Sequence, residues 1–165
     1  MIASSRFRAA LVLAVSYVGV ALPMFAAWEV AQLPLYTIWA EQGVRASLWA
    51  ALHCTIGDAV LAFVTILGAL LATFVASGWR RFRGVAAITV LAGLIVTAIV
   101  EVLSTQWLGR WAYGPLMPVE PLFGIGLSPL AQWIVVPALA LFLLRRALAR
   151  VLSMIAPTKE TRVHD

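Results

Sequence analysis

The sequence contains little charge and almost no cysteine. Charged residues make up 12% of its 165 positions, against about 25% in soluble domains, and Cys54 is the single cysteine. The shortage of charge excludes an ordinary soluble domain, and a single cysteine excludes an internal disulfide framework. The sequence also has no nucleotide-binding or haem-attachment motif, so we expect no cofactor.

Hydrophobic residues dominate instead, at 63% of the sequence and a mean hydropathy of +0.98. A membrane-spanning helix needs about 20 apolar residues. Four stretches are long enough, at about 9–28, 48–76, 85–103 and 130–147, and the second is long enough to tilt. We therefore predict an all-α fold: a polytopic membrane protein with a four-transmembrane-helix bundle and structured outer loops. Residues 1–156 would form one domain, and 157–165 a short cytoplasmic tail.

Basic residues are distributed unevenly between the two ends of the predicted spans. Of the twelve, only Arg45 and Arg110 fall on the side opposite the termini. The positive-inside rule therefore predicts a multi-pass protein of the bacterial inner (plasma) membrane with both termini cytoplasmic. The first apolar run exceeds the about 7–15 residues of a signal peptide, which argues against cleavage. The net charge of +5 then reflects orientation, so we expect the lipid bilayer as a partner and no nucleic acid.

Acidic residues and tryptophans gather at the opposite, outer end of the predicted bundle. Ionisable residues within a span usually face the bundle interior or a wet cavity, because exposure to lipid costs about 2.5–3.5 kcal/mol. Tryptophan favours the interface, but six of the seven at one face exceed an ordinary belt. The pattern predicts an outward-facing polar pocket with aromatic walls. The residues are Glu29, Glu41, Asp58, Glu101 and Glu120, with Trp28, Trp39, Trp49, Trp107, Trp111 and Trp133.

The segment LHCTIGDAV (52–60) places three reactive side chains within two helical turns. Cys54 and Asp58 share a face, whereas His53 lies about 140° from Asp58 and would meet another helix or a loop. His53 and Cys54 suit copper or zinc, with Glu29 or Glu101 and Met117 as further ligands. The bundle has no second histidine and no ligand-spacing motif, so we predict no metal site. Adjacent residues also point about 100° apart, which disfavours a catalytic Cys–His pair.

The stretch 107–133 is apolar and aromatic, yet it contains four prolines and four glycines. Proline forbids a continuous helix there, and irregular backbone at membrane depth must lie against protein or line a cavity. We interpret this stretch as a lid or a partly re-entrant segment over the outer mouth of the bundle. Residues 28–43 are a shorter counterpart, for which we expect an interfacial helix after Pro34.

These observations define a candidate site. Asp58 and Glu101 are the predicted acid–base residues, since carboxyl groups in a low-dielectric pocket suit proton transfer. The alternative is that both only join helices, through hydrogen bonds to Ser, Thr, Trp or Arg110. Glu101 has Thr97 and Thr105 one turn away on either side, which predicts a polar stripe. The predicted ligand-binding residues are Glu29, His53, Gln132, Trp107, Trp111 and Tyr113.

Several of these motifs carry a resemblance. LHCTIGDAVLA, Glu101, WAYGPLMPV and GIGLSPLAQWIVVP resemble a group of small bacterial inner-membrane proteins with four helices, over residues 28–137. The resemblance implies one membrane domain and no particular chemistry. The gathering of histidine and carboxylates in a short bundle is also similar to membrane isomerases of the sterol-isomerase type, from which no residue role is carried over.

Three functions remain open on the sequence alone. The preferred one is an integral inner-membrane protein whose outward-facing pocket binds or acts on a small lipid-soluble ligand. A small transporter or ion-conducting protein is the second, although the inner half offers few polar residues for a path. The third is an accessory or assembly subunit, with a membrane protein or a second copy of the chain as its partner.

Overall fold

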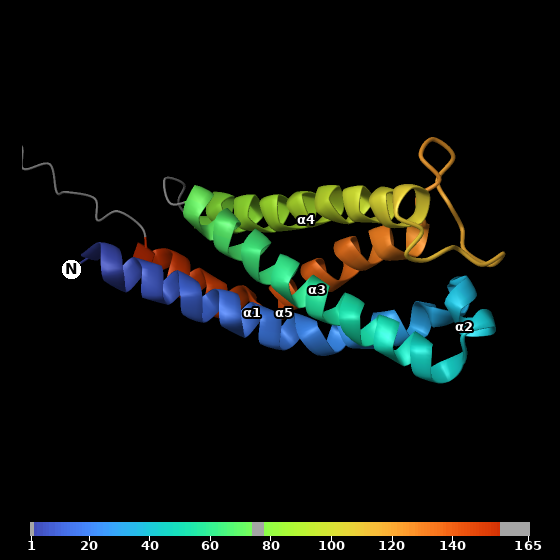
Figure 1. The fold of residues 1–165 in the computed structure, drawn as a ribbon. Coiled ribbons are helices and arrows are strands. Elements are labelled where there is room, and N and C mark those ends of the chain that lie inside the picture. Colours follow the sequence, from blue (N-terminus) through green and yellow to red (C-terminus); the bar gives the residue numbers. More distant parts are fainter. Residues whose placement is uncertain (1, 74–77, 156–165) are drawn as a thin grey trace, which may run out of the picture.

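The computed structural model describes residues 2–73 and 78–155, with side chains over 7–73 and 82–150. Four long helices make up most of this part of the chain (Figure 1): α1 (Ile2–Gln32), α3 (Gly43–Ala72), α4 (Gly78–Val102) and α5 (Leu127–Ile155). Three short elements join them: η1 (Leu33–Leu35), α2 (Thr37–Glu41) and η2 (Leu103–Trp107), a π-helical continuation of α4. The predicted all-α fold is confirmed.

Four helical segments are long and apolar enough to cross a membrane, one for each long helix, and two of them extend into the short elements η1 and η2. The shortest, Leu127–Arg150, has 24 residues and therefore rises about 36 Å, against about 30 Å for the hydrocarbon core. The others are Phe7–Leu35, Gly43–Ala72 and Phe82–Trp107, and mean hydropathy ranges from 2.0 to 2.4. Four helices of this length and hydropathy indicate a multi-pass membrane protein. The second helix begins five residues before the predicted 48 and ends at Ala72, while 74–76 and the tail 157–165 lie outside the described residues.

The helices pack in a ring, in which α1 and α4 each contact both α3 and α5. Small side chains are buried inside this ring: Ala10 and Ala14 on α1, and Ala62 and Ala69 on α3, are fully buried. Small residues are favoured in membrane bundles because they let helix backbones approach closely. Larger leucine, valine and isoleucine side chains on the outward faces remain exposed, as expected of surfaces that meet lipid.

Threonines in this packed region satisfy their own hydroxyl groups. Thr65 donates to the carbonyl of Leu61, and Thr73 to that of Ala69, each at 2.8 Å. A threonine that bonds its own helix in this way presents no hydroxyl donor to a neighbour, which makes it tolerable in an apolar bundle. Thr89 is an exception, because its hydroxyl oxygen is buried without a partner among the described residues. The hydroxyl oxygen of Tyr17 is buried in the same way.

The two ends of the bundle differ, and we name them for what they carry. The loop end holds the 33–42 connection and the 108–126 loop, while α1 begins and α5 ends at the opposite, basic end (Figure 1). The two connections pair through their backbones: Thr37 N–H donates to the Ala112 carbonyl at 3.0 Å, and Gly114 N–H to the Leu35 carbonyl at 2.7 Å. A Cβ at position 114 would lie 3.3 Å from that carbonyl oxygen, so glycine permits the approach.

The 108–126 loop contains a turn organised by Glu120. Its carboxylate accepts the backbone N–H groups of Leu122, Phe123 and Ile125 at 2.6–3.2 Å. Desolvation opposes the charge, but these backbone donors outweigh it and lower the pKa of Glu120 below its ordinary value. After this turn α5 begins at Leu127, with Pro129 in its first turn, where proline is tolerated. The prolines of 107–133 thus prevent a continuous helix only as far as Gly126.

Candidate functional site

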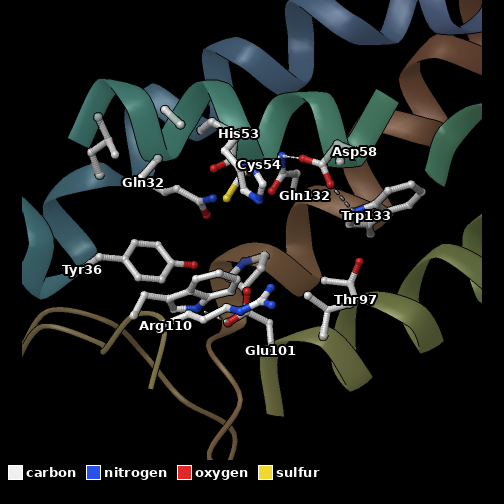
Figure 2. Close-up of a pocket in the computed structure, with 18 of the residues that line it drawn as sticks. Gln32, Tyr36, His53, Cys54, Asp58, Thr97, Glu101, Arg110, Gln132 and Trp133 are labelled. Atoms are coloured by element: carbon white, nitrogen blue, oxygen red, sulfur yellow. Dashed lines mark hydrogen bonds between the residues drawn. The ribbon is translucent and has the colours of Figure 1, made fainter. Parts of the chain in front are cut away.

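A cavity of about 300 Å³ lies inside the loop end of the bundle (Figure 2). Its walls come from all four long helices, from the 33–38 segment and from the 108–126 loop. The volume is at the lower limit of the about 300–1,000 Å³ of small-molecule sites. Most of the lining is apolar, and the polar members are Glu29, Gln32, Tyr36, His53, Cys54, Asp58, Thr97, Glu101, Arg110, Trp111, Gln132 and Trp133.

One wall is a hydrogen-bonded cluster that joins three helices. The side-chain amide of Gln132 on α5 donates to Glu29 Oε1 on α1 and to Asp58 Oδ2 on α3, each at 3.0 Å. The other oxygen of Asp58 accepts the indole N–H of Trp133 at 3.0 Å, as Figure 2 shows. Glu29 and Asp58 are thereby brought together through a single shared amide nitrogen.

The position of Trp133 depends on a glycine in the neighbouring helix. Trp133 is 1% exposed, and its ring lies directly against Gly93 on α4. A Cβ at position 93 would lie 2.0 Å from the indole Cε3, far inside contact distance. The ring of Phe25 on α1 supports the indole from another side, with centroids 5.2 Å apart. Close packing therefore fixes the indole that bonds Asp58.

The facing wall is built around Glu101 near the end of α4. Glu101 Oε2 accepts the Tyr113 hydroxyl at 2.5 Å and the Trp111 indole N–H at 3.4 Å. The Tyr113 hydroxyl in turn accepts the backbone N–H of Gly126 at 2.9 Å. A Cβ added at position 126 would lie 3.0 Å from the Tyr113 ring. Burial raises the pKa of Tyr113, so its hydroxyl remains a donor to Glu101 at neutral pH.

A third set of hydrogen bonds closes the junction of α1 and α5. Trp28 Nε1 donates to the Ser128 hydroxyl at 3.2 Å, and that hydroxyl donates to Gln32 Oε1 at 2.8 Å. Ser128 lies in the first turn of α5, where backbone N–H groups still need acceptors. This chain fixes Gln32, which lines the cavity, against the start of α5.

Several polar groups of the lining have no hydrogen-bond partner within the described residues. The Thr97 hydroxyl is the clearest, since the residue is only 9% exposed. Figure 2 shows the hydroxyl groups of Thr97 and Tyr36 directed into the space between α3 and α4. Burial raises the pKa of Tyr36, so this hydroxyl also stays protonated. Both groups are available to something placed in the cavity.

The structure places most of the predicted site residues on this cavity. Asp58, Glu101, Glu29, His53, Gln132 and Trp111 line it. Tyr113 is not part of the lining but donates a hydrogen bond to Glu101. Trp107 is 78% exposed and is also outside the lining. His53 is itself exposed, while Cys54 and Asp58 share the cavity face of α3 as the helical spacing predicts.

Three contributors were not among the predicted catalytic and ligand-binding residues, although the sequence carried a signal for one of them. Trp133 follows Gln132 directly, and its indole N–H was a potential donor for any nearby carboxylate. Gly93 gave no signal, because an isolated glycine in an apolar helix does not reveal which side chain it faces. Tyr36 also lines the cavity, from just outside α1.

The donors that reach the three carboxyl groups are all neutral: one amide, two indoles and a phenol. Residues 2–73 and 78–155 contain no group of three or more His, Cys, Asp or Glu that could hold a metal ion. The arrangement can bind a polar head group, or transfer a proton to or from one.

Comparison with known proteins found no matching family model, no matching curated protein and no matching solved structure. Function must therefore be argued from the geometry of this site.

Proposed function

We propose that this chain is a ligand-binding protein of the bacterial inner membrane, whose pocket takes a small lipid-soluble molecule with an apolar body and one polar group. The observation that carries the proposal is the cavity itself: polar side chains from four helices converge on one space inside a bundle that is otherwise tightly packed. Concave, mostly apolar sites with a few convergent polar groups are typical of small-molecule binding.

The composition of the walls supports this class of ligand. Leu33, Ile38, Leu61, Val96 and Val100 supply apolar surface, while the carboxyl clusters on α3 and α4 supply polar contacts. A purely polar solute would leave the apolar walls unmatched, and a pure hydrocarbon would leave the carboxyl groups without a ligand partner. An amphipathic molecule satisfies both.

Binding accounts for the structure better than passage of a solute through the bundle. Beyond Leu61 and Trp133 the core closes: Ile66, Leu70 and Val136 are 0–2% exposed. The hydroxyl groups of Thr65 and Thr73 donate to their own helices, so they have no hydrogen left for a passing anion or other acceptor. A transporter would need a polar path through this region.

The orientation is part of the proposal. We place the loop end outside and both termini in the cytoplasm, because arginines concentrate at the basic end. Those with described side chains there are Arg8, Arg83, Arg145, Arg146 and Arg150. The pocket would then open toward the outer leaflet, beneath outer loops that are ordered by the pairing of 112–114 with 35–37.

The same geometry favours a second candidate, acid–base catalysis on the bound molecule. Asp58 and Glu101 lie on opposite walls of one cavity, and each is oriented by an indole donor. A ligand between them would meet one group able to give a proton and one able to accept it. Conversion of the co-purifying molecule should then stop in Asp58→Asn; conversion at the normal rate would exclude this role.

The binding proposal is tested by filling the cavity. Val100 is 43% exposed and lines the cavity from α4, while the adjacent Ile99 is similarly exposed, at 53%, but lies outside the lining. After purification in mild detergent, mass spectrometry should detect a lipid-soluble molecule with the wild type and with Ile99→Trp. Val100→Trp should lose it. Retention of the same molecule by Val100→Trp, at wild-type stoichiometry, would show that it binds elsewhere.

A further inference from the structure

We propose that the polar group of the ligand is cationic, an organic ammonium attached to a small apolar body. This inference rests on the proposed binding function and assigns the chemical class of its ligand. Three features of the described cavity carry it: an excess of carboxyl groups, an unpartnered hydroxyl on a buried residue, and aromatic rings in the walls.

The charge of the lining is unbalanced. Glu29, Asp58 and Glu101 face the cavity, and Arg110 is the one arginine or lysine in the described lining. Two carboxylates that accept from one amide nitrogen repel each other, so we assign a single proton to the Glu29–Asp58 pair. With Glu101 ionised and Arg110 positive, the lining then carries one net negative charge, which a monocation would neutralise.

The hydrogen bonds already present do not remove this charge. Gln132 and Trp133 orient Asp58, and Tyr113 and Trp111 orient Glu101, but all four donors are neutral. In a low-dielectric site an uncompensated carboxylate attracts a cation strongly. An anionic ligand would meet the opposite field and is disfavoured.

The Thr97 hydroxyl is the independent second feature. Most described threonines of the helices donate to a carbonyl one turn back, among them Thr55, Thr65, Thr73 and Thr105. Thr97 makes no such bond within the described residues, is 9% exposed, and points into the cavity between Asp58 and Glu101 (Figure 2). The enclosed hydroxyl oxygens without a partner in the described residues are those of Tyr17 and Thr89, so the Thr97 oxygen is accessible from the cavity. The Thr97 oxygen would accept an ammonium N–H.

Aromatic walls complete the match. Tyr36 and Trp111 line the cavity, and the faces of such rings attract cations within about 6 Å. An organic ammonium uses these rings and the apolar lining together. A bare divalent metal uses neither, and the described residues lack the ligand cluster it needs.

The test compares three probes that share one apolar body: 2-phenylethylammonium, 2-phenylethanol and phenylacetate. Binding is measured by calorimetry in nanodiscs of zwitterionic phosphatidylcholine, which do not concentrate either charge. Only binding that Val100→Trp abolishes is counted as pocket binding. We expect the ammonium to bind about tenfold more tightly than the alcohol, and the carboxylate to bind most weakly.

The outcomes separate the two proposals. Pocket binding of the alcohol that equals or exceeds that of the ammonium overturns the cationic assignment and leaves the binding function in place. If none of the three probes shows binding that Val100→Trp abolishes, and no molecule co-purifies with the wild type, both proposals fail.

A charge-removing variant gives a second readout. Glu101→Gln keeps the shape and an acceptor oxygen for Tyr113, and should weaken ammonium binding about tenfold while changing alcohol binding less than about twofold. Glu41→Gln is the matched control, since Glu41 is exposed at the end of α2 and outside the cavity. Equal losses for both probes in Glu101→Gln would reduce Glu101 to a structural role and overturn the assignment.

Discussion

Replacing Gly93 by alanine should destabilise the bundle and disturb the site at once. The new Cβ would lie 2.0 Å from Trp133 Cε3, and 2.4 and 2.9 Å from two more ring atoms, whereas ordinary contact begins at 3.4 Å. The indole or the helix must therefore move by about 1.4 Å. Trp133 cannot move freely, because Phe25 packs against its ring and Asp58 holds its N–H.

The size of the effect follows from three contributions. Overpacking a filled interior costs about 1–3 kcal/mol. Losing the interhelical bond from Trp133 to Asp58 adds about 0.6 kcal/mol, the average for such bonds in a membrane bundle. Alanine offsets about 0.5–1 kcal/mol, because glycine is the weaker helix former. We therefore expect the free energy of unfolding to fall by about 0.6–3 kcal/mol.

The assay is unfolding in mixed micelles of dodecyl sulfate and maltoside, followed by circular dichroism. Gly68→Ala is the matched control: it lies on α3, is exposed, and a Cβ there would meet nothing within 4 Å. That variant should be neutral or slightly more stable. Trp133→Phe in the Gly93→Ala background should recover part of the overpacking cost, since a smaller ring relieves the contact. A Gly93→Ala protein as stable as Gly68→Ala would refute the proposed contact.

Two further predictions concern the loop end. Glu120 has a lowered pKa, so its contribution to loop stability is present above the ordinary glutamate pKa of about 4.3 and is lost as the pH falls through the lower folded value. Amide exchange at Phe123 and Ile125, corrected for the intrinsic effect of pH, should accelerate in acid. In Glu120→Gln these amides should exchange faster already at neutral pH. Unchanged protection in acid and in the variant would contradict the turn. The orientation predicts that a tag after residue 165 is protected from protease in intact spheroplasts, whereas a tag inserted at 122 is cleaved. The reverse pattern would invert the topology.

The sequence contained much of the site but not its pairings. It placed Asp58 and Glu101 at the same end of the bundle, from their distance along helices whose length is set by the membrane. It predicted the Cys54–Asp58 face from helical spacing alone, and it predicted that Thr97 would lie one turn from Glu101. Each of these statements depends only on the rise and rotation of a residue within its own helix, together with the thickness of the membrane.

Only the tertiary structure decided which groups from different helices meet. The sequence treated Asp58 and Glu101 as the carboxylate pair, yet the shared amide of Gln132 joins Asp58 to Glu29, and Glu101 is held separately by Tyr113. The rotation of each helix about its axis determines these partners, and packing details such as the Gly93–Trp133 contact set that rotation. Periodicity within a helix carries no information about its neighbours, so the sequence could locate the polar end but could not choose its contacts.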